Sequence, residues 1–267
     1  MHLKRGDLME IGISSSCFFP LETEKSFLKL AEMGAKTAEI FFNSEIELSG
    51  KIFETIKKVK EDNGITIRSI HPFTSYAEPF MLFGSYKRRI TEGIEYYKQY
   101  FEAAEKLGAE CVVLHGGNKG KHNDEDYFES FRMLCDAAKP YGVLPVHEIV
   151  NRRSASDIDF LKRLNKEFKD EFKIVLDTKQ CRRCGVDEFE IINTFPNDIM
   201  QVHISDFDET RDCIPPGEGK YDFKKLFDSL QAVGYDKSAI IELYNWGYSD
   251  EIQIKNSKVY LENLISK

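Results

Sequence analysis

Six side chains able to bind a metal or move a proton stand at the ends of short apolar runs. They are His71, His115, Glu148, Asp177, His203 and Glu242. Any one of them alone is more often a buried polar group that finds a backbone hydrogen-bond partner. The last four close successive runs, however, and would meet in one pocket if those runs are neighbouring parallel strands. Uncompensated carboxylates repel one another there, so the sequence predicts a divalent cation that relieves the repulsion.

Three carboxylates and one imidazole form the predicted ligand set for a single divalent ion. Its members are Glu148, Asp177, His203 and Glu242. Oxygen and nitrogen donors with room for water or substrate suit Mn²⁺, which we place first, and also Co²⁺, Mg²⁺ or Zn²⁺. Cysteine takes no part in this set.

The closest cysteine pair, Cys181 and Cys184, has the spacing of a zinc knuckle. No second cysteine or histidine pair is present to complete four ligands, which argues against a structural zinc site. We interpret the pair as reduced cysteines in a surface loop, because a chain of this length needs no disulfides for stability.

The elements that must position these residues are eight short β-rich runs separated by amphipathic stretches. The predicted strands cover residues 9–14, 37–42, 65–70, 110–115, 143–149, 172–177, 199–205 and 238–243. Strict alternation of strands and helices implies parallel strands, and eight units favour a single (β/α)8 TIM barrel over an open sheet. The catalytic groups of such barrels lie at the C-terminal ends of the strands, where the six residues stand. A dinucleotide-binding fold lacks its main marker, because no GxGxxG follows the first run.

Several helical stretches end in glycine before the next strand begins, as expected of left-handed helix ends. These glycines are Gly34, Gly64, Gly108, Gly142 and Gly234. We expect one barrel domain over residues 9–267. Residues 1–8 are polar and are predicted to be a flexible N-terminal extension, or to precede an alternative start at Met9.

Composition narrows the classes of function. With 267 residues, 42% hydrophobic and 31% charged, the chain is typical of a soluble globular protein. Its net charge of −8 argues against a nucleic-acid partner. No apolar run is long enough for a membrane span or a signal peptide, so we expect a cytoplasmic protein without a membrane partner. Homo-oligomerisation stays open, because barrel helices are amphipathic whether or not they form interfaces.

Several motifs together resemble the xylose-isomerase-like barrel superfamily, in particular its sugar isomerases and epimerases of the ketose 3-epimerase type. They are HEIVNR (147–152), LDTKQ (176–180), VHISD (202–206), PPGEGKYDF (215–223) and IIELY (240–244). In those epimerases a Glu-Asp-His-Glu set binds the metal, and it corresponds to the ligand set predicted above. The resemblance further implies that Glu148 and Glu242 are catalytic acid–base groups. A histidine is common three positions after the aspartate, where this chain has Gln180, and this difference leaves the sugar and the reaction open.

The superfamily also contains metal-dependent endonucleases that cut DNA at abasic sites. His71 and His115 match two of their metal ligands. Those enzymes need further histidines where this chain has Gln180 and a stretch containing Arg211 and Cys213, so we treat DNA repair as a lesser alternative. The two histidines are then predicted to contact sugar hydroxyls or to pack in the core.

Movement of a proton beside a carbonyl requires a base and stabilisation of the enediolate that forms. If the substrate's carbonyl and neighbouring hydroxyl lie between Glu148 and Glu242, one carboxylate removes a proton and the other delivers one from the opposite face. This gives epimerisation. Delivery to the adjacent carbon gives aldose–ketose isomerisation, and loss of a hydroxyl gives an inosose-type dehydratase (a lyase). A sugar-binding barrel without catalysis is a further alternative.

The predicted substrate is a small sugar or polyol ketone, or its phosphate. Basic residues just beyond strand ends could bind a phosphate or carboxylate, although solvated loop charges are about as common. An aromatic residue near the last strand could contact the sugar carbons. The predicted substrate-binding residues are His71, His115, Arg152, Lys179, Gln180, Arg211 and Trp246.

Overall fold

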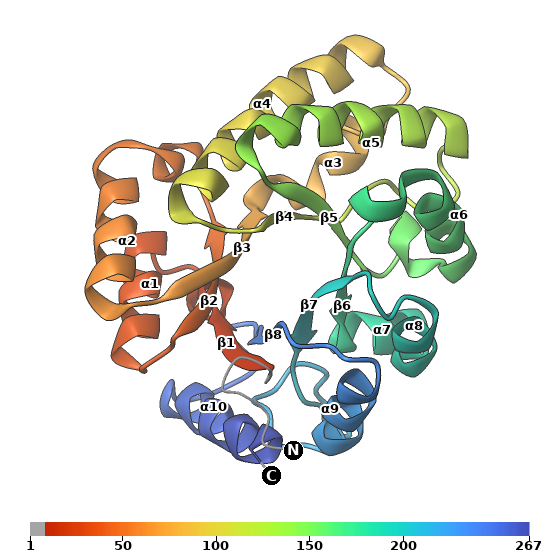
Figure 1. Ribbon diagram of the computed structural model, residues 1–267. Coiled ribbons are helices and arrows are strands. Elements are labelled where there is room, and N and C mark those ends of the chain that lie inside the picture. Colours follow the sequence, from red (N-terminus) through yellow and green to blue (C-terminus); the bar gives the residue numbers. More distant parts are fainter. Residues whose placement is uncertain (1–8, 267) are drawn as a thin grey trace.

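Eight parallel strands close into a barrel in the computed structural model, which describes residues 9–266 (Figure 1). Each strand pairs with the next along the chain, and β8 pairs with β1. The strands are β1 (Glu10–Ser14), β2 (Thr37–Phe42), β3 (Thr66–Pro72), β4 (Cys111–Leu114), β5 (Leu144–Glu148), β6 (Ile174–Asp177), β7 (Ile199–Ile204) and β8 (Ser238–Ile241). The predicted (β/α)8 barrel is confirmed. The predicted extension over residues 1–8 lies outside the described part of the chain.

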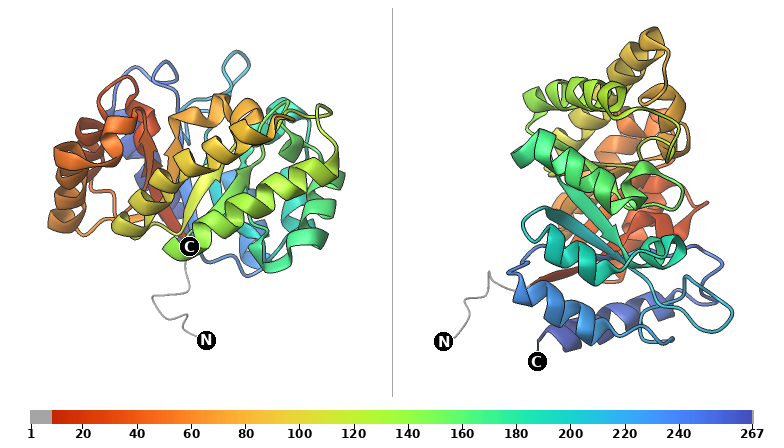
Figure 2. Two further views of the ribbon diagram at one scale, coloured as in Figure 1. Left: turned by 90° about the horizontal axis from the view of Figure 1, so that it is seen from above. Right: turned by 90° about the vertical axis from the view of Figure 1, so that its right-hand side faces the viewer.

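Helices surround this sheet (Figures 1 and 2). They are α1 (Thr23–Glu32), α2 (Gly50–Asn63), α3 (Glu78–Met81), α4 (Lys87–Leu107), α5 (Asp124–Ala138), α6 (Ile158–Phe168), α7 (Thr178–Cys184), α8 (Glu188–Thr194), α9 (Phe223–Ala232) and α10 (Ile252–Ile265). Across residues 9–266, none of them combines the length and apolar character that a membrane span requires.

Short 3-10 helices occur at both ends of the barrel. Four of them follow strands at the C-terminal end: η1 (Ser15–Phe18), η2 (Glu45–Leu48), η3 (Phe73–Tyr76) and η5 (Ser154–Ser156). Two others precede strands: η4 (Lys139–Tyr141) and η6 (Lys169–Glu171). The long connections after β7 and β8 also project from the C-terminal end (Figure 2). This end therefore has the longer and more varied segments.

The return connections at the opposite end are short because helices stop abruptly. Gly64 and Gly108 end α2 and α4 with left-handed backbone, at φ 60° and 70°, a conformation that glycine adopts without a steric penalty. The next strands begin at Thr66 and Cys111. The predicted glycine stops are confirmed at these two positions.

Apolar packing between sheet and helices accounts for most of the core. Its largest fully buried side chains include Phe27, Tyr97, Phe101, Phe131 and Phe172. The inside of the barrel below its C-terminal mouth is instead partly polar, with a buried hydrogen-bonded group that consists of Ser14, Glu39, Ser69, Gln201 and His203. This polar layer supports the site described next.

Candidate metal centre

The strand ends bring the four predicted ligands together. Glu148 and Asp177 are the last residues of β5 and β6, His203 is the penultimate residue of β7, and Glu242 follows β8. Asp177 and His203 are paired residues in the sheet. One ligand atom from each of the four lies within 4.8 Å of the others, which is a spacing that a single metal ion could bridge. These residues form a candidate metal-binding cluster at the mouth of the barrel.

Two buried carboxylate oxygens in this cluster face basic side chains without forming an aligned hydrogen bond: Asp177 Oδ2 lies 3.3 Å from Lys179 Nζ, and Glu148 Oε2 lies 3.0 Å from His115 Nε2. The other Asp177 oxygen accepts from the backbone N–H of Gln180 and so caps α7 (2.9 Å). His203 Nδ1 lies 3.3 Å from Glu148 Oε1 and 3.6 Å from Glu242 Oε2. Buried carboxylate oxygens without an aligned hydrogen-bond donor are costly, and a divalent cation would satisfy them, so the donor set fits a metal.

Burial and neighbouring charge shift the pKa values of the cluster in opposite directions. Burial, together with the carboxylates of Glu148 and Glu242, raises the pKa of Asp177 to about 7. Burial also acts to raise the pKa of Glu148, but the imidazoles of His115, His203 and His71 outweigh it and hold that pKa well below its ordinary value. The position of Asp177 among other carboxylates thus favours a proton or a cation there.

Lys179 contributes a buried positive charge beside two of the ligands. Its Nζ donates to Glu242 Oε2 at 3.0 Å and lies 3.3 Å from Asp177 Oδ2. The ring of Tyr244 covers the ammonium, with 4.7 Å to its centroid. Lys179 was expected to bind a substrate anion, whereas in this structure its charge is directed at the candidate metal ligands.

A second group of residues could also hold an ion, and it shares Glu148 with the first. His115 Nε2 and His71 Nε2 lie 3.0 Å and 3.5 Å from Glu148 Oε2. Although burial lowers it, contact with Glu148 raises the pKa of His71 to about 9. The two histidines therefore border the candidate metal centre.

Glu39, in the middle of β2, was missed by the sequence analysis. It is fully buried, and its Oε2 lies 3.0 Å from His203 Nε2. Ser69 and Gln201 also donate to this oxygen. Since Nε2 faces Glu39, the proton of the His203 ring belongs there, and Nδ1 is left to face the cluster as a ligand atom. The available signal was a glutamate inside the apolar run TAEIFF.

A cavity of about 290 Å³ adjoins the cluster. Four of the predicted substrate-binding residues line it: His71, His115, Lys179 and Gln180. Phe19, Phe41 and Tyr244 supply an apolar wall, and Glu148 and Glu242 also face the space. The two predicted catalytic glutamates thus share this cavity with polar and aromatic side chains that could contact a small ligand.

Three other predicted substrate-binding residues lie outside this cavity. Arg152 is exposed, and Arg211 pairs with Asp208 at 2.7 Å. Trp246 stacks on Tyr244, with ring centroids 5.1 Å apart. Their contact with a substrate stays a prediction.

The predicted surface loop around Cys181 and Cys184 is wrong. Both residues lie in α7, and Cys181 is fully buried. Asp177 caps this helix at its first turn, which is why the segment after β6 continues directly into a helix.

A closed (β/α)8 barrel with polar groups at its C-terminal mouth is the architecture of a large class of enzymes. Within that class, this chain belongs to the xylose isomerase-like TIM barrel family, whose model matches residues 27–263. The resemblance inferred from the sequence motifs is therefore confirmed.

Three solved structures share the fold at identities below 25%. The apo form of 3-keto-D-glucoside 4-epimerase from E. coli is 19% identical, with a TM-score of 0.77 over 96% of this chain and 99% of that one. D-Psicose 3-epimerase with D-tagatose, from Clostridium cellulolyticum H10, is 16% identical, with a TM-score of 0.76 and coverages of 97% and 98%. The IolI protein with a bound zinc atom is 19% identical, with a TM-score of 0.78 and coverages of 97% and 98%.

Proposed function

We propose that this protein is a divalent-metal-dependent isomerase or epimerase of a small sugar or sugar phosphate. The observation that carries the proposal is the cluster of Glu148, Asp177, His203 and Glu242, in which two buried carboxylate oxygens lack an aligned hydrogen-bond donor, at the edge of a cavity of about 290 Å³. Two of the similar structures are those of sugar epimerases, and a third contains zinc, which supports this chemistry.

In the proposed mechanism Glu148 and Glu242 exchange protons with the carbon beside the substrate carbonyl. A bound metal, held by the four ligands, would supply the positive charge that stabilises an enediolate. One glutamate removes the proton and the other delivers one from the opposite face. Glu39 holds the His203 ring in place, and the aromatic wall excludes water from the reacting carbons. Epimerisation is the outcome we place first, and isomerisation and inosose-type dehydration follow from the same enediolate.

Solvent deuterium incorporation tests this proposal. We expect the metal-loaded protein to exchange a carbon-bound proton in some member of a panel of ketoses, ketose phosphates and cyclic polyol ketones, as measured by mass spectrometry. Glu218→Gln, which changes an exposed glutamate paired with Gln253, is the matched control and should exchange normally. Stoichiometric metal without exchange in any member of the panel would contradict the proposal.

A two-metal phosphoesterase is the second candidate function, and the group of His71, His115 and Glu148 favours it. Sharing of Glu148 between two ions would give the paired metals that such hydrolases use. The net charge of −8 and Gln180 argue against DNA as the substrate. Two zinc ions per chain together with cleavage of abasic-site DNA would establish this alternative, whereas one ion per chain favours the epimerase.

A further inference from the structure

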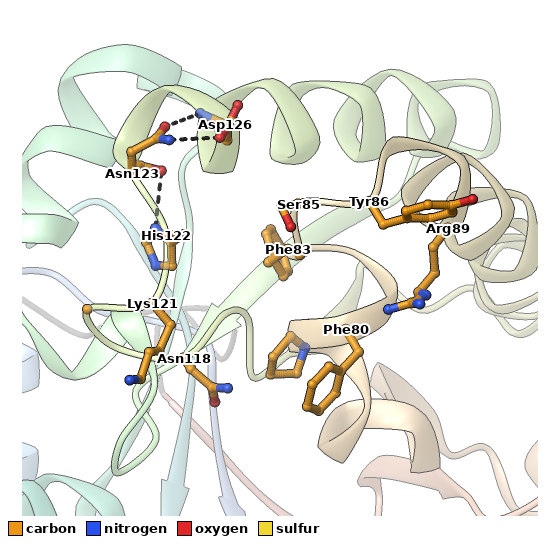
Figure 3. Close-up of a pocket in the computed structure, with 13 residues that line it drawn as sticks. Phe80, Phe83, Ser85, Tyr86, Arg89, Asn118, Lys121, His122, Asn123 and Asp126 are labelled. Atoms are coloured by element: carbon orange, nitrogen blue, oxygen red, sulfur yellow. Dashed lines mark hydrogen bonds between the residues drawn. The ribbon is translucent and has the colours of Figure 1, made fainter.

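A second and larger cavity, of about 840 Å³, opens between the segments that follow β3 and β4 (Figure 3). Phe80, Phe83 and Tyr86, from α3 and the connection to α4, give it an aromatic lining. Asn118 and Lys121 face it from the segment between β4 and α5. Since both segments follow the C-terminal ends of strands, this cavity opens at the same end of the barrel as the candidate metal centre.

Two cations that line this cavity form no ion pair with the described residues. Lys121 stands on one side, and Arg89 stands on the other with its guanidinium 5.5 Å from the ring centroid of Tyr86 (Figure 3). Nearby lysines behave differently: Lys87 pairs with Glu129 at 2.9 Å, and Lys119 lies 3.9 Å from Asp157. Asp126 also lines the cavity, and its Oδ2 accepts from the Asn123 amide at 2.7 Å, so the two cations leave the lining with a net positive charge. On a chain with a net charge of −8, this local positive charge indicates an anionic ligand.

A buried arginine stands behind one wall of the cavity. Arg153 is 9% exposed, and its Nη1 donates to Asn118 Oδ1 at 2.8 Å while Nη2 donates to the carbonyl of Tyr76 at 3.5 Å. No described carboxylate pairs with it. Because Arg153 holds the amide oxygen of Asn118, the amide NH₂ group is left as a donor. This wall therefore combines a free N–H donor, an ammonium group and a buried positive charge.

We propose that the larger cavity binds the phosphate group of a small phosphorylated ligand. A phosphate has several acceptor oxygens and can accept from Asn118 and Lys121 on one wall, while Arg89 on the other side adds positive charge across the cavity. A carboxylate is best bound by a free arginine fork, and the fork of Arg153 is already divided between two acceptors. Phe80 and Phe83 can contact the carbon skeleton next to the phosphate.

The ligand is assigned as the substrate itself, and this assignment rests on the proposed function. His115 lines the catalytic cavity, and Asn118 lines the larger one only three residues later. Three extended residues span at most about 11 Å, which limits the backbone distance between His115 and Asn118 to a length that one phosphorylated sugar could bridge. The reacting carbons would lie beside Glu148, and the phosphate would lie beside Asn118.

Calorimetric titration with inorganic phosphate tests the site. We expect Lys121→Ala to weaken binding roughly tenfold, the usual effect of losing one charge-assisted contact, and Arg89→Ala to weaken it by a smaller factor, because its charge acts across the cavity. Arg88→Ala and Lys119→Ala are matched controls, because they remove neighbouring exposed cations that do not line the cavity. The metal-deficient variant Asp177→Ala/His203→Ala should still bind phosphate, which separates this site from phosphate bound to the metal.

The outcomes separate the two proposals. No phosphate binding at millimolar concentration, or equal losses in the cavity variants and the controls, would overturn the anion site. If phosphate binds but does not compete with phosphorylated ketoses in the deuterium exchange assay, the ligand is a separate molecule and the substrate assignment is wrong. If phosphate binds as expected and no ketose exchanges, the proposed enzyme function fails while the anion site stands.

Discussion

Charged residues are arranged differently at the two ends of the barrel. At the N-terminal end, Arg68 pairs with Glu10 at 2.9 Å and with Glu110 at 2.6 Å, and Lys173 pairs with Asp198 at 2.7 Å. At the C-terminal mouth, one ligand atom from each of three carboxylates and one histidine lies within 4.8 Å of the others, and two of the carboxylate oxygens are buried without an aligned hydrogen-bond donor. In the first arrangement each carboxylate contacts a basic side chain in a partly exposed ion pair, whereas the second gathers buried carboxylates at one point and is costly until a metal cation joins it.

This difference indicates at which end of the barrel a ligand can gain binding free energy. Paired, half-exposed charges contribute modestly to stability and offer nothing to a ligand. Buried polar groups without aligned hydrogen bonds are stabilised most when a ligand supplies an opposite charge. A binding site is therefore expected where such groups gather. The following predictions test the metal centre at the C-terminal end first and the ion pairs at the N-terminal end last, in order of decreasing effect.

The largest effect is expected from removal of two ligands. Asp177→Ala/His203→Ala should abolish metal binding and activity, because half of the donor set is lost. Circular dichroism should still show a folded barrel, since residues at the mouth contribute little to the packed interior. Elemental analysis measures the metal. Stoichiometric metal in this variant would contradict the assigned centre, and the wild-type protein should lose thermal stability when a chelator removes its metal.

Glu148→Gln and Glu242→Gln should each lower turnover by roughly 10²-fold or more, the usual contribution of a positioned general base. Both variants keep one carbonyl oxygen, so part of the metal affinity should survive. Deuterium exchange should be lost for opposite epimers in the two variants, because each glutamate serves one face of the enediolate. Near-normal turnover in both, with metal bound, would leave the glutamates as ligands only.

Metal affinity should rise with pH through about 7. In the metal-free protein the pKa of Asp177 is raised to about 7 from an ordinary value of 3.8, so the folded state holds this proton more tightly than the unfolded state. This group's stabilising effect is complete below the unfolded pKa and is lost as pH rises toward the folded pKa. Since metal must displace the proton, affinity should rise about tenfold per pH unit below the folded pKa of Asp177. Competition titrations across this range check the slope, and a flat profile would contradict it.

Lys179→Met should strengthen metal binding by roughly tenfold. The ammonium contacts Glu242 and Asp177, and its removal takes away a cation that competes for their oxygens. The metal-free variant should be less stable than the wild type, and the increase in melting temperature on metal addition should be larger. Lys119→Met, at an exposed position, is the control. Weaker metal binding in Lys179→Met would show that the lysine supports the ions instead of competing with them.

The smallest effect is expected at the other end of the barrel. Arg68→Ala removes two partly exposed ion pairs and should lower the free energy of unfolding by about 1 kcal/mol. Metal affinity and deuterium exchange should be unchanged, because the residue lies far from the mouth. Chemical denaturation and metal titration together check this. A change in metal affinity would mean that the two ends are coupled.

Much of the candidate metal centre was predictable because it depends on position along the chain. Parallel strands align their C-terminal ends, so residues that close successive apolar runs must meet, and Glu148, Asp177, His203 and Glu242 could be selected on that basis. The barrel itself followed from eight alternations of strand and helix, and its glycine stops followed from the chemistry of helix ends.

Only the tertiary structure decided which residues meet from distant elements. Glu39 faces His203 because closure of the barrel places β2 across from β7, and no local pattern encodes that contact. Lys179 follows Asp177 by two residues, yet only the first turn of α7 directs its ammonium toward Glu242. Arg153 and Asn118 are 35 residues apart and form one wall because two loops pack together. The spacing of apolar residues and the order of the strands determine the backbone position of a residue. The direction of a long side chain depends instead on the residues that pack around it.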